Sequence, residues 1–253
     1  MKRILLIFLT CQVSSFSHGQ TISNSQAINK SGKQRALSQR IAKDYLMILA
    51  GIKTEEAAKD LDEYASVFNE NLHDLTIYAK TKETKDLLTN ISEIWRQLRL
   101  EVTEEPSSNA AIKVIEDANS LLTLANSLTE KIVTQSGLKS GTLVNMSGKQ
   151  RMNIQRISVF YLANYLKLSK DYSSQMKETI SNFESSLNNL LLATENTEEI
   201  NTLLKLQQQE WAFFKKSIMN QNNMLPASVF SSSNLMVKEF DQITKMYEEV
   251  ASK

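Results

Sequence analysis

The chain has 253 residues, with 29 lysines and arginines against 28 aspartates and glutamates, so it is close to neutral. A nucleic-acid-binding surface normally shows a clear basic excess, and this balance argues against one. Only six glycines, two prolines and one cysteine occur, and long stretches carry apolar residues at spacings of three and four. These features exclude an internal disulfide and indicate an all-helical (all-α) protein.

The first 19 residues have the pattern of a secretory signal peptide. Lys2 and Arg3 precede the apolar run Ile4–Thr10, and small residues stand near Gly19, where we expect cleavage. The run is too short to span a bilayer, which takes about 20 residues. A lipid on Cys11 is disfavoured, because the three residues before it are not the small ones that usually precede a lipidated cysteine. We therefore expect a periplasmic or secreted protein.

In chain order, the apolar spacing predicts four helices in the first half of the chain. Capping residues and acidic first turns mark where they begin, while Gly51 is well placed to end the first helix and Pro106 breaks the chain before the fourth. The expected ranges are about 24–50, 54–79, a third helix from 81, and 109–134.

The second half of the chain repeats this order of helices. Trp211 stands where Trp95 stands in the first half, and Pro226 precedes the last helix as Pro106 precedes the fourth. We interpret these matched aromatic residues as core. Four amphipathic helices with short connections form an up-down-up-down bundle. We therefore predict a signal peptide (1–19) followed by two tandem antiparallel four-helix domains (21–134 and 142–253), joined by a flexible linker (135–141).

The strongest signal is a segment that occurs twice. Asn29–Leu46 (NKSGKQRALSQRIAKDYL) returns 116 positions later as Asn145–Leu162 (NMSGKQRMNIQRISVFYL), with 11 of 18 positions identical. The identical positions include polar residues, whereas an amphipathic helix would need only a repeated apolar pattern. We call these segments the two boxes and expect the functional site there. The candidate ligand-binding residues are Ser31, Gly32, Arg35, Gln39 and Arg40 in the first box, and Ser147, Gly148, Arg151, Gln155 and Arg156 in the second.

Helical geometry separates the two arginines of each box. At about 100° per residue, Arg35 falls on the edge of the apolar arc, and Arg151 lies equivalently. Arg40 projects from the opposite face, where we expect it to be solvated, and Arg156 also points away. An arginine at the margin of an apolar face needs an anion or hydrogen-bond acceptors, because an unpaired charge there is costly.

The glycines indicate how the first arginines could meet. A glycine inside a helix costs up to about 1 kcal/mol relative to alanine, so Gly32 and Gly148 point to a close approach at the backbone. If the boxes pack about a pseudo-twofold axis, Arg35 and Arg151 face each other across a small gap. Their planar donor forks would then suit a shared planar oxyanion.

The segments INKSGKQRALSQRIAK and VNMSGKQRMNIQRISV resemble the signature of the PilJ/NarX-type sensory domain. This domain is the extracytoplasmic module of type IV pili chemotaxis transducers and of nitrate/nitrite sensor kinases. The shared pattern, Asn-x-Ser/Ala-Gly-x-x-Arg-x-x-x-x-Arg, covers about twenty residues in each half; elsewhere the resemblance rests on helix count and order. It implies a four-helix bundle whose first helices pair and hold nitrate or nitrite between Arg35 and Arg151. One chain would then supply both halves of a site that is otherwise formed by a dimer.

The chain departs from the receptors of this family in two respects. They carry transmembrane helices and a signalling region, whereas here Lys253 follows the eighth helix directly, so a signal would have to pass through a membrane signalling protein as partner. Residues 36–38 differ from residues 152–154, which makes the half-sites unequal and leaves the identity of the ligand open.

The leading hypothesis is a secreted or periplasmic, non-catalytic binding protein for a small oxyanion, without cofactor or metal. The alternative is a structural or partner-binding bundle without a small ligand, in which each arginine pairs with a carboxylate of its own half, such as Asp117 or Glu239. An enzyme is disfavoured, because after the signal peptide the chain has no cysteine, His73 as its one histidine, and no nucleophile elbow or phosphate loop. A homodimer stays open, because the boxes could pair within one chain or between two.

Overall fold

The computed structural model describes residues 22–137, 141–220 and 222–251. Within these ranges the chain forms eight helices and no strand, which confirms the predicted all-helical fold. The helices are α1 (Asn24–Leu49), α2 (Thr54–Tyr78), α3 (Lys82–Thr103), α4 (Ser108–Ser136), α5 (Gly141–Tyr165), α6 (Ser173–Leu191), α7 (Glu198–Met219) and α8 (Pro226–Ala251). Residues 1–19, the predicted signal peptide, lie outside the described residues.

Local chemistry explains where the helices begin and end. The Ser23 hydroxyl accepts a hydrogen bond from the Gln26 N–H, and the Gln26 side chain accepts one from the Ser23 N–H, so a capping box starts α1. Gly51 follows the end of α1 with a φ of +67°, a left-handed conformation that glycine adopts without strain. α4 continues to Ser136 and α5 starts at Gly141, so both ends of the predicted linker are helical.

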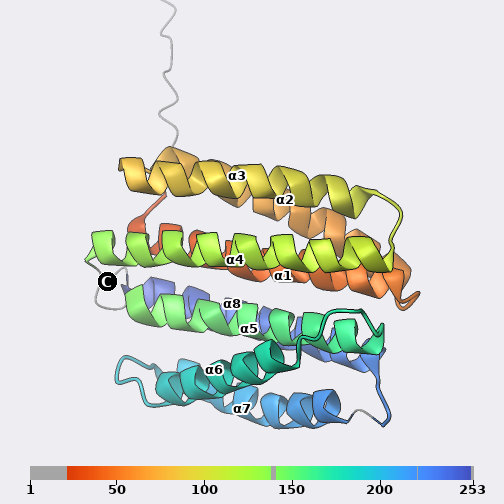
Figure 1. The fold of residues 1–253 in the computed structure, drawn as a ribbon. Helices are drawn as coiled ribbons and strands as arrows, with labels where there is room; N and C mark the ends of the chain where they lie inside the picture. The colour runs from red at the N-terminus through yellow and green to blue at the C-terminus, as the bar shows by residue number, and fades with distance from the viewer. Residues whose placement is uncertain (1–21, 138–140, 221, 252–253) are drawn as a thin grey trace, which may run out of the picture.

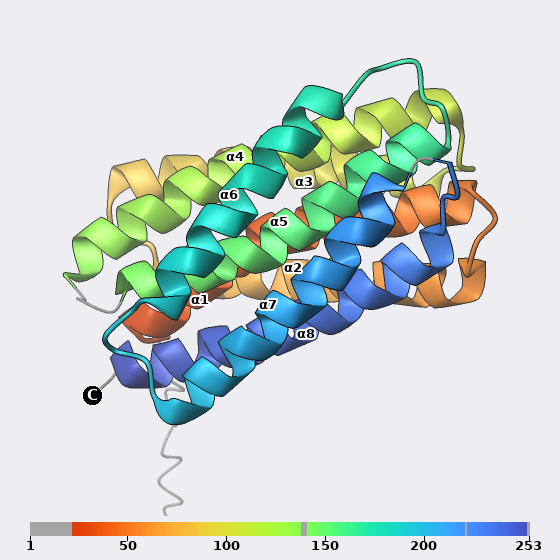
Figure 2. The ribbon, with the colours of Figure 1, turned by 90° about the horizontal axis from the view of Figure 1, so that it is seen from below.

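The helices stack in four layers of two (Figure 1). The layers are α2 with α3, α1 with α4, α5 with α8, and α6 with α7. Seen from the outer face of the second half, α6 and α7 lie across α5 and α8 (Figure 2). α1 and α5 contact each other directly, so the two boxes pair within one chain. In the described part of the chain, no helix combines the length and apolarity needed to cross a membrane.

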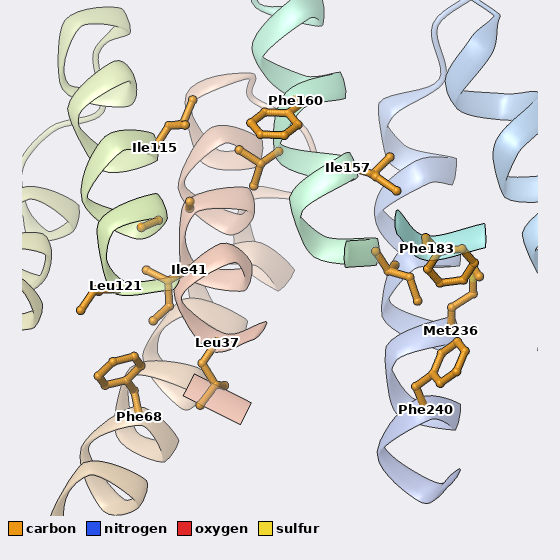
Figure 3. Close-up of a cluster of buried hydrophobic side chains, with 14 of the residues drawn as sticks. Leu37, Ile41, Phe68, Ile115, Leu121, Ile157, Phe160, Phe183, Met236 and Phe240 are labelled. Carbon is orange, nitrogen blue, oxygen red and sulfur yellow. The ribbon is translucent and has the colours of Figure 1, made fainter. Parts of the chain in front are cut away.

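Aromatic residues at matched places pack inside each half. The Phe68 and Trp95 rings stack with centroids 4.1 Å apart, and the Phe183 and Trp211 rings lie 4.2 Å apart. All four side chains are buried, which confirms that they are core residues. Figure 3 shows Phe68 and Phe183 among the aliphatic side chains of this core.

The box helices are buried on nearly every side. Helices pack around α1 from the two layers that flank it as well as from its own layer, and α5 has a similar position in the second half. Polar residues of α1 are therefore buried together with its apolar arc, and these include Arg40, Lys43 and Asp44. The prediction that Arg40 is solvated was wrong, because periodicity within one helix does not report a second layer packed on its polar face.

Candidate functional site

The two box glycines lie where the arginine side chains cross the α1–α5 contact. A Cβ placed on Gly32 would lie 2.8 Å from Arg35 Nη2, and one placed on Gly148 would lie 3.1 Å from Arg151 Nη2. Both distances are shorter than an ordinary carbon–nitrogen contact, so an alanine would push on the guanidinium. The glycines therefore make room for the arginines, as the repeated spacing had indicated.

The two guanidinium groups face each other across this contact. Arg35 Nη2 and Arg151 Nη2 both lie within 3.5 Å of the Cβ position of Gly148, so they are separated by less than twice that distance. Arg35 is 0% exposed and Arg151 is 1% exposed. Two like charges thus meet in the protein interior, where they repel unless negative charge or acceptor groups offset them.

The partners of Arg35 are neutral. Its Nη1 donates to Asn126 Oδ1 (2.9 Å), its Nε to the Gly32 carbonyl (3.3 Å) and its Nη2 to the Asn145 carbonyl (3.4 Å). Burial, with a further contribution from the charge of Arg151, lowers the pKa of Arg35 to about 9. The guanidinium is therefore protonated at neutral pH, but it carries a charge that no carboxylate contacts among the described residues.

Arg151 has a carboxylate partner. It forms an ion pair with Asp241 of α8 through Nη1, and its Nη2 donates to Asn29 Oδ1 (3.0 Å). The Asp241 carboxylate also lies 3.9 Å from Lys33 Nζ, and its side chain is 37% exposed. The site is therefore asymmetric, because α4 places Asn126 where α8 places Asp241.

These ion pairs bear on the alternative hypothesis, in which each box arginine pairs with a carboxylate of its own half, such as Asp117 or Glu239. The carboxylate that meets Arg151 is Asp241 and not Glu239, which accepts a hydrogen bond from Gln207. Among the described residues, no ion pair joins Arg35 to Asp117. Pairing with a carboxylate of the same half thus accounts for one arginine; the other has no carboxylate in contact among the described residues, although the charge of Glu130 on α4 acts on Arg35 from further away.

Ser31, Ser147, Gln39 and Gln155 form no hydrogen bond with the arginine pair among the described residues. The hydroxyls of Ser31 and Ser147 donate to carbonyls of their own helices, and Gln39 Nε2 donates to Asn119 Oδ1 (3.4 Å). The side-chain amide of Gln155 has no hydrogen-bond partner among the described residues. Their predicted role in ligand binding rests on their recurrence in both boxes, one helical turn from the first arginine.

Arg40 and Arg156, the second arginines of the two boxes, lie away from the Arg35–Arg151 pair. Arg40 is buried, forms ion pairs with Asp44 (3.5 Å) and Asp60, and stacks over the Tyr64 ring. Arg156 is half-buried, with its guanidinium 5.2 Å from the centre of the Phe160 ring. The two therefore have different surroundings.

Four identical box residues have a structural role that sequence analysis did not assign. Gln34 donates to the Phe68 carbonyl (3.1 Å) and Gln150 to the Phe183 carbonyl (2.9 Å). These hydrogen bonds link α1 to α2 and α5 to α6. The Tyr45 and Tyr161 hydroxyls accept N–H groups at the chain segments before α4 and α8. Their identity in both boxes was a visible signal for this role.

A comparison with protein families identifies the family of the chain. The family described as type IV pili methyl-accepting chemotaxis transducer N-term (PilJ) matches residues 20–128 and again residues 132–229. The chain belongs to the PilJ family. The resemblance expected from the boxes is thereby confirmed, and PilJ domains are sensory, non-catalytic helical domains. No curated protein matches the chain, and no solved structure matches it either.

The described residues of this PilJ protein contain no group of three or more histidine, cysteine, aspartate or glutamate side chains placed to hold a metal ion. The arginine pair offers hydrogen-bond donors and positive charge, and among the described residues Asp241 is the carboxylate in contact with it. Such donors suit the oxygen atoms of an anion.

Proposed function

We propose that this chain is an extracytoplasmic sensory-type binding protein that holds a small monovalent oxyanion, nitrate or nitrite, between Arg35 and Arg151. The observation that carries the proposal is the buried arginine pair, which brings two positive charges together against one carboxylate. A single negative charge between the guanidiniums would balance the pair. Planar donor groups also match the planar shape of nitrate, because each can donate two parallel hydrogen bonds.

Calorimetric titration with nitrate and nitrite tests this proposal. The wild type should give binding heat, and Arg35→Gln and Arg151→Gln should each weaken binding at least about tenfold, because a charged hydrogen bond contributes about 1.5–3 kcal/mol. Arg96→Gln is the matched control, since Arg96 is exposed on α3 and remote from the boxes. Absence of binding heat in the folded wild type with both anions would refute the proposal.

The second candidate function is a structural or partner-binding bundle without a small ligand. It is favoured by the Arg151–Asp241 ion pair and by the box glutamines that fasten the helices. In that case the arginine variants would lower the melting temperature equally with and without nitrate. Thermal melts of the same variants therefore separate the two functions.

The proposal also covers where the protein is located and which partner senses the bound anion. The pattern of residues 1–19 supports cleavage near Gly19 and a periplasmic or secreted location, with a membrane signalling protein as the partner that would read the bound state. Cell fractionation, combined with the mass of the exported protein, tests the cleavage. Intact protein retained in the cytoplasm would contradict it.

A further inference from the structure

A second feature lies beside the arginine pair, on the side of Arg151. A cavity of about 320 Å³ opens between α1, α2, α5 and α8. Arg151 and Asp241 form part of its wall, whereas Arg35 does not line it. Its volume is at the lower end of the range for small-molecule sites, which is about 300–1,000 Å³.

A buried amide without a partner lines this cavity. Gln155 is 0% exposed, and neither its Oε1 nor its Nε2 has a hydrogen-bond partner among the described residues. Leaving a buried polar group unpaired costs about 1–3 kcal/mol. A ligand group that both donates and accepts hydrogen bonds would recover this cost.

The unequal halves of the chain explain why Gln155 is unpaired. Its counterpart Gln39 donates to Asn119 of α4. The matching residue of α8 is Asn234, but its oxygen accepts a hydrogen bond from Lys43 and its amide donates to Asp60 (3.4 Å). The second box has Val159 where the first has Lys43. Asn234 thus forms its hydrogen bonds with side chains of the first half, Lys43 and Asp60. Gln155, which lines the cavity, therefore has no hydrogen-bond partner among the described residues.

The wall of the cavity favours an anion. Lys33, Arg151 and Lys238 line it together with one carboxylate, that of Asp241, which serves both Lys33 and Arg151. Arg40 also lines it, but Asp60 compensates its charge. Lys238 is exposed and has no ion pair among the described residues.

The rest of the wall is apolar. Leu37, Val237 and the ring of Tyr64 line the cavity, together with Leu235, which is 46% exposed. A small inorganic ion would leave this apolar surface uncovered, whereas an organic ligand would bury it at a gain of about 25 cal/mol per Å². The wall therefore combines positive charge, an apolar surface, and the donor and acceptor atoms of the unpaired Gln155 amide.

We propose that this cavity binds a small organic carboxylate that carries a hydroxyl group, at a site that shares Arg151 and Asp241 with the inorganic oxyanion site but does not include Arg35. The carboxylate meets the lysines, the hydroxyl pairs with Gln155, and the apolar body packs against Leu37 and Leu235. The site does not depend on the nitrate proposal, because Arg35 takes no part in it.

The test is a calorimetric titration with 4-hydroxybenzoate, benzoate, acetate and nitrate. The wild type should bind 4-hydroxybenzoate more tightly than benzoate, and acetate weakly. Lys238→Gln should weaken both aromatic acids about tenfold, and Gln155→Met should remove the preference for the hydroxylated acid. Lys245→Gln, an exposed lysine of α8 that does not line the cavity, is the matched control and should bind as the wild type does.

Two results would overturn the proposal. One is that the folded wild type binds neither aromatic acid; the other is that Lys238→Gln binds both as tightly as Lys245→Gln. Because Lys238 is exposed, this variant keeps the proposal testable even if Gln155→Met fails to fold. Arg35→Gln should weaken nitrate binding at least about tenfold and bind 4-hydroxybenzoate as the wild type does, so failure of one site is distinguishable from failure of the other.

Discussion

Replacing Asn126 by aspartate would give Arg35 the kind of partner that Arg151 already has. Asn126 and Asp241 hold matched places on α4 and α8, and each accepts a hydrogen bond from Nη1 of one box arginine. The two side chains have nearly the same size, so packing should be retained. The substitution thus changes the charge of the site with little change in its shape.

The structure allows the effect to be estimated. Asn126 Oδ1 lies 2.9 Å from Arg35 Nη1, and converting a neutral hydrogen bond to a charged one adds about 1 kcal/mol or more. Glu130, whose carboxylate accepts a hydrogen bond from the Asn126 amide (2.9 Å), would repel the new carboxylate and offset part of this gain. Because aspartate also loses the hydrogen bond to Glu130, we expect a net stabilisation of only about 0.5 kcal/mol, which raises the melting temperature by about 1–2 °C for a chain of this size.

Anion binding should change in the opposite direction. With a carboxylate on each arginine, the site has no excess positive charge, and a monovalent anion would meet two negative groups instead of one. We expect nitrate affinity to fall at least about tenfold, a loss of about 1.4 kcal/mol. Thermal melts without nitrate and calorimetric titrations with it measure the two effects separately.

Asn119→Asp is the control, because Asn119 lies on the same helix and contacts Gln39, not the arginine pair. It should leave nitrate binding unchanged. If Asn126→Asp bound nitrate as tightly as the wild type, the uncompensated charge of Arg35 could not be what attracts the anion, and the reasoning would fail.

Three further substitutions test other parts of the structure. Gly32→Ala should keep the fold but lower nitrate affinity about tenfold in calorimetry, because its Cβ would lie 2.8 Å from Arg35 Nη2 and displace a charged donor; unchanged affinity would show that the close approach is unimportant. Burial lowers the pKa of Lys43 from 10.5 to about 7. Between these two pH values the unfolded chain binds a proton that the folded chain does not. The free energy of unfolding should therefore rise with pH by up to about 1.4 kcal/mol per pH unit. Lys43→Met should remove this rise in urea unfolding measured from about pH 7 to pH 9, and a rise that persists would assign it to other groups. Tyr161→Phe should lose the hydrogen bond from the Leu225 N–H (2.7 Å) and lower stability by about 1 kcal/mol in the same assay, whereas an unchanged value would mean that water replaces the hydroxyl.

The helices and the meeting of Arg35 with Arg151 could be predicted from the sequence. Helix boundaries follow from local signals such as caps, Gly51 and apolar spacing, all of which act within a few residues. The meeting of the arginines follows from repetition, because glycines kept twice inside a helix indicate a close contact between the two copies. The first inference uses the sequence of a single helix, and the second compares one helix with its repeated copy.

The surroundings of the boxes were decided by tertiary structure alone. The burial of Arg40, the choice of Asp241 over Glu239 and the unpaired amide of Gln155 all depend on how α2 and α8 pack against the box helices, which the pattern of a single helix does not report. Apolar periodicity reports one buried face, but α1 and α5 lie in the middle of four layers and are buried on several faces at once. The sequence therefore determined which two arginines face each other, and the packing of α4 and α8 around them decided that only one has a carboxylate.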